Sequence, residues 1–190
     1  MVNLYLDGCS FTYGVGLSVH QTLEAHFKDA GYNIINLSRP GKSNIAIAQD
    51  TYNHSSQADI FVLGFTFAQR YWFKYDTYNI DLLPSNVAWP IDDENGQGIE
   101  IEKILTNLHK NFYLLFDSKH WENVSDMLID NTLNSLKFKN KRVFAYSWQP
   151  RNTQNKLMYP IITDRLKDGH LNDVGTKKLF ELIQCNLGNS

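Results

Sequence analysis

Residues 58–65 read Ala-Asp-Ile-Phe-Val-Leu-Gly-Phe, and this stretch decides the fold class. The run from Ile60 to Leu63 has no polar face, whereas a strand exposed on one side would alternate apolar and polar residues. Strands that are apolar on both faces are typical of parallel sheets covered by helices on both sides. Residues 58–65 are therefore expected to form a central strand of an α/β protein.

The segments on either side of this strand continue the same pattern. Three further strands are predicted at residues 2–6, 32–37 and 142–147. Apolar residues with helical spacing occur at residues 18–30, 44–52, 99–137 and 172–187. Ser18 and Gln21 have the spacing of a capping box, Ser43 is the expected N-cap of the second helix, and the third segment is expected to break near Asp117. This alternation predicts a parallel sheet with helices on both faces.

The bulk composition fits one globular domain that spans residues 1–190. Hydrophobic residues make up 43% of the chain and charged residues 20%, with a formal net charge of -2. No run of Lys and Arg exceeds two residues, which argues against a nucleic-acid partner. No apolar run approaches the roughly 18 residues that would span a membrane, so no membrane partner is expected.

The N-terminal residues and the cysteines bear on the compartment. The chain opens with Met-Val-Asn-Leu-Tyr-Leu-Asp, without the basic segment and apolar stretch of a secretory leader. Cys9 and Cys185 are the two cysteines, too few for a disulfide framework or a zinc pattern. A reducing, cytoplasmic location is expected, although a phage component released by cell lysis would also lack a leader.

Residues 66–98 lose all periodicity and are expected to form an irregular insertion. Aromatic residues gather in it, at Tyr71, Trp72, Tyr75, Tyr78 and Trp89. Three interpretations remain open for this aromatic group. It stacks on a sugar ligand, it forms a subunit interface in a homo-oligomer, or it makes a satellite core beneath the insertion.

Several polar residues follow the predicted strands and are candidates for chemistry. In parallel sheets, sites form beyond the carboxyl ends of the strands, where Ser10, Thr66 and His170 are expected. A serine hydroxyl needs a base to take its proton, and His170 is the candidate, with Asp168 two residues earlier to orient the ring. A glycine such as Gly41 lets the backbone approach an oxyanion closely.

Three stretches of the chain resemble the sequence blocks of the SGNH (GDSL-like) hydrolases, in family order. Gly8-Cys9-Ser10-Phe11-Thr12-Tyr13-Gly14 resembles the first block, Asn36-Leu37-Ser38-Arg39-Pro40-Gly41-Lys42-Ser43-Asn44 the second, and Asp168-Gly169-His170-Leu171-Asn172 the fifth. The resemblance implies a three-layer α/β/α flavodoxin-like fold with a central parallel sheet of about four to five strands. It also implies ester hydrolysis through an acyl-enzyme on Ser10, with Gly41 at the oxyanion position and no cofactor.

The sequence departs from the family pattern at the oxyanion position of the third block. The family reads Gly-x-Asn-Asp there, whereas this chain reads Gly64-Phe65-Thr66-Phe67. Thr66 is either a hydroxyl donor to the oxyanion or a residue that ends the strand. Asn44 either starts a helix or faces the site, and Arg70 is inferred to replace lost anion stabilisation.

Two departures also surround the nucleophile and the base. Cys9 stands where the family has Asp, and it is interpreted as a buried small residue rather than a thiol nucleophile. The spacing from Asp168 to His170 is two residues, where three is commoner in the family. The remaining histidines show no ligand spacing, so no metal is expected.

The leading hypothesis is therefore hydrolysis of a small-molecule or carbohydrate ester, such as an O-acetyl group on a sugar. The alternative is a non-catalytic SGNH-like binding or structural module, for instance in a phage particle or a glycan-processing cluster. A nucleotide-binding flavodoxin-like domain is disfavoured because the chain lacks a glycine-rich phosphate loop.

Overall fold

A four-stranded parallel sheet forms the centre of the computed structural model, which describes residues 2–75, 78–82, 87–88, 107, 111 and 117–188. Its strands are β1 (Asn3–Gly8), β2 (Asn33–Asn36), β3 (Ile60–Phe65) and β7 (Arg142–Ser147). They lie in the order β2-β1-β3-β7, and all three pairings are parallel. The prediction of a central strand at residues 58–65 is confirmed, since β3 pairs with a strand on each side.

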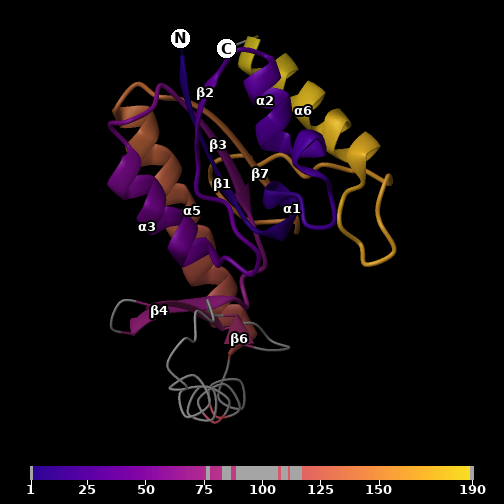
Figure 1. Ribbon diagram of the computed structural model, residues 1–190. Coiled ribbons are helices and arrows are strands. Elements are labelled where there is room, and N and C mark those ends of the chain that lie inside the picture. Colours follow the sequence, from indigo (N-terminus) through magenta and orange to yellow (C-terminus); the bar gives the residue numbers. More distant parts are fainter. Residues whose placement is uncertain are drawn as a thin grey trace.

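Two helical layers cover the sheet, so the three-layer α/β/α architecture is confirmed (Figure 1). On one face lie α3 (Asn44–His54) and α5 (Ser118–Phe138), and on the other lie α2 (Leu23–Asp29) and α6 (Asp173–Gly188). Along β1, Leu4 and Leu6 join the core with α2 and α6, whereas Tyr5 joins the core with α3 and α5. This alternation is why the strands are apolar on both faces.

The starts of the helices test the capping predictions. Ser43 caps α3 as expected, because its Oγ accepts a hydrogen bond from the N–H of Ala46 at 3.3 Å. The capping box of Ser18 and Gln21 is present, but it opens a short 3₁₀ turn, η1 (Val19–Gln21), and α2 begins afterwards with Thr22 as its cap. The prediction of one continuous helix over residues 18–30 was therefore wrong at its start.

Part of the insertion at residues 66–98 is regular, which corrects the expectation of an irregular loop. An antiparallel sheet forms from β4 (Tyr71–Tyr75), β5 (Tyr78–Leu82) and β6 (Val87–Ala88). The Tyr71 ring packs edge-on against Trp121 of α5 at 4.8 Å. Trp89 and the side chains of Trp72, Tyr75 and Tyr78 lie outside the described part, so the role of the aromatic group stays a prediction.

The structure describes the second of the two helices that were predicted on either side of a break near Asp117. α5 begins at Ser118, where the Asp117 carboxylate accepts hydrogen bonds from the N–H groups of Lys119 and His120. The helix expected before it, from residue 99 on, lies outside the described residues except for 107 and 111, both of which are helical. Both chain termini lie at the end of the sheet opposite α1, so they are remote from the carboxyl ends of the strands (Figure 1).

Candidate active site

Two neighbouring glycines place the candidate nucleophile over the end of the sheet. Gly8 of β1 pairs with Gly64 of β3, and the short helix α1 (Ser10–Tyr13) follows directly. A Cβ on Gly8 would lie 2.1 Å from Thr12 Oγ1, and one on Gly64 would lie 2.3 Å from the same atom. Because neither glycine has a side chain, α1 can pack directly on the end of the sheet. There Thr12 Oγ1 and Tyr146 Oη form a hydrogen bond of 2.8 Å.

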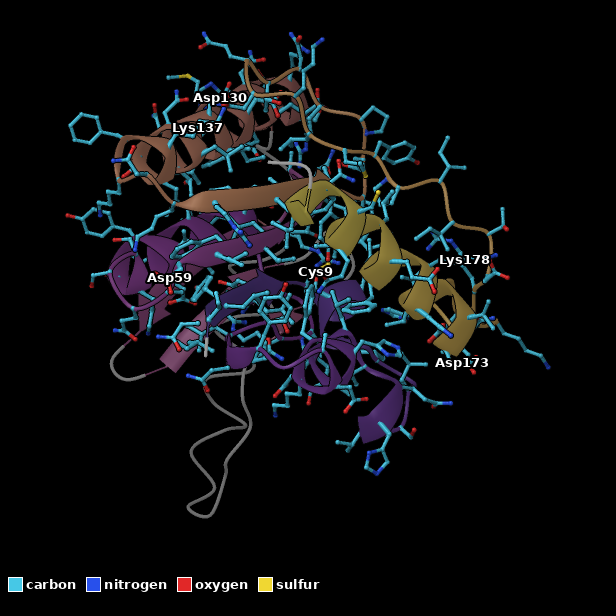
Figure 2. All side chains as sticks on the ribbon, turned by 90° about the horizontal axis from the view of Figure 1, so that it is seen from above. Cys9, Asp59, Asp130, Lys137, Asp173 and Lys178 are labelled. Carbon is cyan, nitrogen blue, oxygen red and sulfur yellow. The ribbon has the colours of Figure 1, made fainter. Side chains whose placement is uncertain are left out.

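Ser10 is the first residue of α1, and Cys9 precedes it as the N-cap. Only 8% of Ser10 is exposed, and its N–H donates no hydrogen bond within the described part of the chain. Cys9 is fully buried and belongs to the core between the sheet and α2 and α6 (Figure 2). That burial agrees with the interpretation of Cys9 as a packing residue, because a thiol nucleophile must be accessible.

His170 and Asp168 form a close pair in the loop before α6. His170 Nδ1 lies 3.1 Å from Asp168 Oδ2, and the His170 N–H donates to Asp168 Oδ1 at 3.1 Å. The hydrogen bond from the His170 N–H and the nearby His170 ring lower the pKa of Asp168, so its carboxylate stays ionised at neutral pH. Nδ1 is buried and makes no aligned hydrogen bond, so its approach to Oδ2 at 3.1 Å is a close contact rather than a hydrogen bond.

Phe11 connects the serine segment to the histidine. Its ring lies 4.8 Å from the His170 ring and 4.7 Å from that of Trp148, which follows β7. Since Phe11 is the residue next to Ser10, this contact brings the candidate nucleophile and base to the same edge of the sheet. Three segments far apart in the sequence therefore meet at the carboxyl ends of the strands.

Backbone pairing holds the loop that carries His170 in a fixed shape. Leu166 N–H donates to the His170 carbonyl at 2.7 Å, and Asn172 N–H donates to the Asp164 carbonyl at 3.1 Å. A Cβ on Gly175 would lie 2.3 Å from the Asp164 carbonyl oxygen, so this position requires glycine. The imidazole is thus presented from a constrained turn that packs against the start of α6.

A buried ion cluster fixes the segment that contains Gly41, and sequence reasoning missed it. Lys42 is fully buried, and its Nζ lies 2.6 and 2.8 Å from the two carboxylate oxygens of Asp7, 2.6 Å from Asp50 Oδ2 and 2.9 Å from the Leu37 carbonyl. One side chain therefore ties β1, the loop after β2 and α3 together. Gly41 has a positive φ of 78° and its N–H donates no hydrogen bond within the described residues.

Burial dominates the electrostatics of this cluster. Desolvation raises the pKa of Asp7 to about 6, against the attraction of Lys42. The Tyr5 hydroxyl donates to Asp7 Oδ2 at 2.8 Å, and burial raises the pKa of Tyr5 as well. The Gly8 N–H donates to Asp7 Oδ1 at 2.7 Å, so donors surround the carboxylate. The only signal in the sequence was an Asp at the end of an apolar strand.

Thr66 is held at the end of β3 by its backbone, while its hydroxyl stays unbonded. Asn44 Oδ1 accepts from the Thr66 N–H at 2.7 Å, and Asn44 Nδ2 donates to the Thr66 carbonyl at 3.0 Å and to Ser125 Oγ at 2.8 Å. Arg151 Nη2 also donates to the Thr66 carbonyl. Thr66 Oγ1 is buried and has no hydrogen-bond partner among the described groups.

This arrangement places Asn44 and Arg70 in supporting positions. Asn44 starts α3, and its amide is fully engaged with the Thr66 backbone and Ser125. Arg70 donates to the Lys42 carbonyl at 3.4 Å and lies over the Phe67 ring at 5.2 Å. It therefore braces the Gly41 segment, and a direct role toward an anion stays a prediction.

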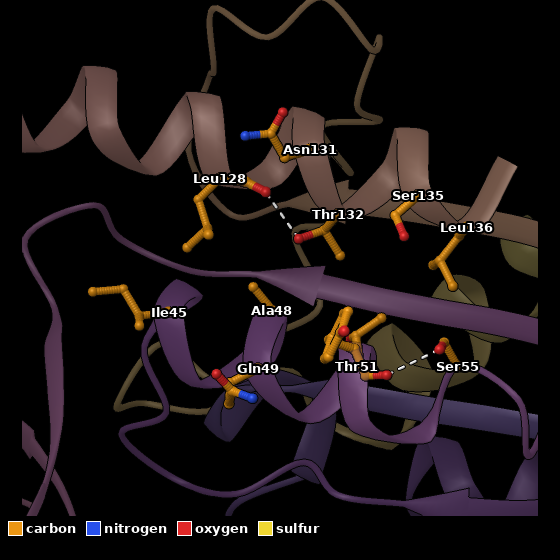
Figure 3. Close-up of a pocket in the computed structure, with 11 residues that line it drawn as sticks. Ile45, Ala48, Gln49, Thr51, Ser55, Leu128, Asn131, Thr132, Ser135 and Leu136 are labelled. Carbon is orange, nitrogen blue, oxygen red and sulfur yellow. Dashed lines mark hydrogen bonds between the residues drawn. The ribbon is translucent and has the colours of Figure 1, made fainter. Parts of the chain in front are cut away.

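Two cavities lie near this region, and they differ in character. A cavity of about 500 Å³ next to Arg151 has both polar and apolar surface and is lined by Lys119, Glu122, Asp126, Gln149, Pro150, Arg151 and Asn152. A second cavity of about 260 Å³ between α3 and α5 is mainly apolar, with Ala48, Tyr52 and Leu128 in its wall (Figure 3). None of the predicted site residues lines either cavity.

Among the described residues, no group of three or more His, Cys, Asp or Glu side chains is arranged to hold a metal ion. None of the helices in these ranges is both long and apolar enough to cross a membrane.

Comparisons with known proteins rest on structure alone, since no family model and no curated protein matches this sequence. The chain is similar to the psychrotrophic esterase EstA from Pseudoalteromonas sp., whose structure was determined inhibited by monoethylphosphonate. The TM-score is 0.55 at 10% identity, over 99% of this chain and 100% of that one. A protein assigned to the G-D-S-L family of lipolytic proteins, from Desulfitobacterium hafniense DCB-2, matches with a TM-score of 0.39 at 12% identity, over 96% and 98% of the two chains.

The likeness to EstA establishes the fold, which agrees with the α/β/α fold implied by the resemblance to SGNH hydrolases. At 10% identity it carries no residue from one chain to the other. The second likeness is too weak to add to the argument.

Proposed function

We propose that this protein hydrolyses carboxylic esters with Ser10 as nucleophile, His170 as general base and Asp168 as the group that orients the imidazole. One observation carries the proposal: Phe11, the neighbour of Ser10, packs at 4.8 Å against the ring of a histidine that is paired with an aspartate. These groups gather at the carboxyl edge of a parallel sheet, where such folds bind their ligands.

The reaction follows from the roles of these groups. Ser10 Oγ attacks the ester carbonyl as its proton passes to His170 Nε2, and a tetrahedral intermediate forms. Collapse of the intermediate breaks the C–O bond, and the proton returns from His170 to the departing alcohol. Water then attacks the acyl-enzyme with the help of the same base, which releases the acid and restores Ser10. The steps require no cofactor.

Three donors are proposed for the oxyanion. The N–H groups of Ser10 and Gly41 are unused within the described chain, and Thr66 Oγ1 is a buried hydroxyl without a partner. A buried polar group left unbonded is unfavourable, so it calls for a partner such as a water, an ion or a ligand. The clamp of Asn44 and Arg151 on the Thr66 backbone holds that hydroxyl at the end of β3.

The alcohol part of the substrate is proposed to be a carbohydrate or a similarly polar group. The cavity of about 500 Å³ presents carboxylates, amides and cations, the mixture of acceptors and donors that sugar hydroxyls require. It adjoins the candidate oxyanion position through Arg151, which both lines the cavity and donates to the Thr66 carbonyl.

A non-catalytic binding module is the second candidate function. Its support is the geometry at His170, where Nδ1 makes no aligned hydrogen bond, and the exposure of the Asp168 side chain, which reaches 55%. A triad aspartate is normally buried and bonded to the ring nitrogen. The two candidates differ in whether Ser10 reacts.

The test is covalent labelling combined with turnover. The wild-type protein is treated with a fluorophosphonate probe and assayed with 4-nitrophenyl acetate, alongside Ser10→Ala, His170→Ala and Cys9→Ala. We expect probe adduct on Ser10 by mass spectrometry, loss of labelling and turnover in the first two variants, and little change in Cys9→Ala. Wild-type turnover no faster than that of Ser10→Ala, without any adduct, would favour the binding module.

A further inference from the structure

Arg165 lies in the loop that carries His170 and contacts the candidate site through several groups. Its Nε donates to the Ile162 carbonyl at 3.1 Å, and its Nη1 donates to the Gly169 carbonyl at 2.6 Å. The guanidinium carbon lies 5.6 Å from the Phe11 ring centroid and 5.7 Å from that of Trp148. Two hydrogen bonds and two ring contacts fix the direction in which this charge points.

The charge of Arg165 is not neutralised by any carboxylate in the described part of the chain. The two acidic residues nearest to it in sequence are already engaged, Asp164 with Lys178 at 2.7 Å and Asp168 with His170 at 3.1 Å. A guanidinium has five N–H donors, and the described contacts of Arg165 use two of them. The exposed side chain therefore retains free donors and a full positive charge.

The position of this charge connects it to the proposed chemistry. Phe11 contacts both Arg165 and His170, and it is the immediate neighbour of Ser10. The guanidinium therefore borders the proposed site on the side of Phe11 and His170. A planar, fixed guanidinium fork matches the paired oxygens of a carboxylate, sulfate or phosphate.

We propose that Arg165 recognises an anionic group on the substrate, so that the preferred esters carry a carboxylate, sulfate or phosphate close to the scissile bond. The proposal rests on the proposed function and names the substrate class of that site. An arginine that served only to brace the loop would act equally on every substrate, whereas a recognition residue distinguishes charged from neutral esters.

The experiment compares matched ester pairs in the wild-type protein, Arg165→Lys and Arg165→Gln. For the alcohol side the pair is 4-acetoxybenzoate and the neutral 4-acetoxybenzamide. For the acyl side it is mono-4-nitrophenyl adipate and 4-nitrophenyl hexanoate. We expect a preference for the charged member of one pair, and Arg165→Gln should lower its kcat/KM about 10- to 100-fold, mainly through KM.

The controls separate recognition from positioning. On the neutral esters Arg165→Gln should stay within about threefold of wild type, and Arg165→Lys should fall in between on the charged ones, since it keeps the charge but loses the fork. An equal loss of kcat on charged and neutral esters would assign Arg165 to positioning of His170 and overturn the proposal. No preference for either charged ester in the wild type would overturn it as well.

A binding measurement keeps this result independent of catalysis. Calorimetry of Ser10→Ala, with and without Arg165→Gln, is performed with 4-acetamidobenzoate, the amide counterpart of the ester, and with adipate. We expect at least one anion to bind tenfold more weakly when Arg165 is replaced, even if no ester is hydrolysed. If no ester is hydrolysed but Arg165→Gln still weakens anion binding, the proposed hydrolase function is refuted and Arg165 remains an anion-binding residue. Equal binding by both proteins would refute the role of Arg165.

Discussion

Replacement of Lys42 by methionine tests whether the buried ion cluster holds the Gly41 segment in place. Lys42 and Asp7 are both fully buried, and Nζ contacts both carboxylate oxygens of Asp7 at 2.6 and 2.8 Å. Lys42→Met keeps most of the apolar stem but leaves the Asp7 carboxylate without a cation. Removal of one partner from a buried pair costs about 3–5 kcal/mol, because the remaining charge is desolvated and uncompensated.

The size of the expected effect is large for a domain of 190 residues. At roughly 2–4 °C per kcal/mol, the melting temperature of Lys42→Met should fall by about 10 °C. Ester hydrolysis, if measured below the transition, should fall with it because Gly41 loses its anchor. Circular dichroism on heating gives the melting temperature, and circular dichroism in urea gives the unfolding free energy, with midpoints and slopes compared with those of the wild type.

The pH dependence of this loss has a definite sign. The pKa of Asp7 in the folded protein is about 6, above its ordinary value of 3.8, so the folded state retains the proton more strongly than the unfolded state. Stability associated with Asp7 is therefore lost as pH rises from about 4 through 6. Without the attraction of Lys42 the pKa of Asp7 rises further, so the penalty of Lys42→Met should be greater at pH 8 than at pH 5.5.

The double variant Asp7→Asn/Lys42→Met is the matched control. It removes both buried charges and retains an acceptor for the Tyr5 hydroxyl, so it should recover most of the stability lost in the single variant. Asp50 remains, but its side chain is 35% exposed and can be hydrated. A single variant within about 1 kcal/mol of wild type at pH 8 would refute the argument. A double variant no more stable than the single would do the same.

Three further predictions concern the edge of the sheet. Thr66→Val should leave the unfolding free energy unchanged or raise it slightly, because the hydroxyl has no hydrogen-bond partner. If that hydroxyl is an oxyanion donor, the same variant should lower kcat about 10²- to 10³-fold. Gly64→Ala should lower the unfolding free energy by about 1–3 kcal/mol in denaturant titrations, since its Cβ would lie 2.3 Å from Thr12 Oγ1. Asp168→Asn should reduce kcat by about 10²- to 10⁴-fold at pH 7, because the amide cannot hold the His170 tautomer. The pH profile of kcat is measured from pH 5 to 9. An unchanged kcat would exclude Asp168 as the group that orients His170.

The fold could be predicted because its determinants are local and repeated. The run Ile60–Phe65 is buried on both faces, and that property alone requires two covering layers. Ser43 and Asp117 mark helix starts through side-chain bonds to backbone groups three or fewer residues away. Such signals depend on neighbours in sequence, so a single chain suffices to recognise them.

The sheet of β4, β5 and β6 and the start of α2 were not predicted from the sequence. Residues 78–82 of β5 do alternate apolar and polar residues, so a strand signal was present there, whereas β4 is aromatic at four of its five positions and β6 has only two residues. The capping box at Ser18 predicted a helix start, but the chain forms a 3₁₀ turn and Thr22 caps the α-helix instead. Tertiary packing overrides a local preference in such cases.

The candidate site also contains residues that could be predicted from local motifs and residues that could not. Ser10, Asp168 and His170 were identified because a short motif surrounds each of them, whereas Lys42 and Arg151 carry long charged side chains that ordinarily lie on the surface. Lys42 is fully buried, and the Arg151 side chain is 3% exposed. Their burial follows from Asp7 and from the Thr66 carbonyl, partners more than 30 residues away in the chain. No pattern within either segment indicates such a partner.

The distribution of amides and hydroxyls at the edge of β3 gives the site its particular character. In the family pattern an asparagine side chain donates to the oxyanion, but here the asparagine amide belongs to Asn44 and is occupied by the Thr66 backbone and Ser125. Asn44 therefore supports the Thr66 backbone, and among the three proposed oxyanion donors the Thr66 hydroxyl is the only side chain. A hydroxyl donates one hydrogen bond and can rotate, so its orientation depends on the groups around it. Asn44 and Arg151 fix the backbone from which the Thr66 hydroxyl projects. This clamp therefore limits the orientations of the hydroxyl.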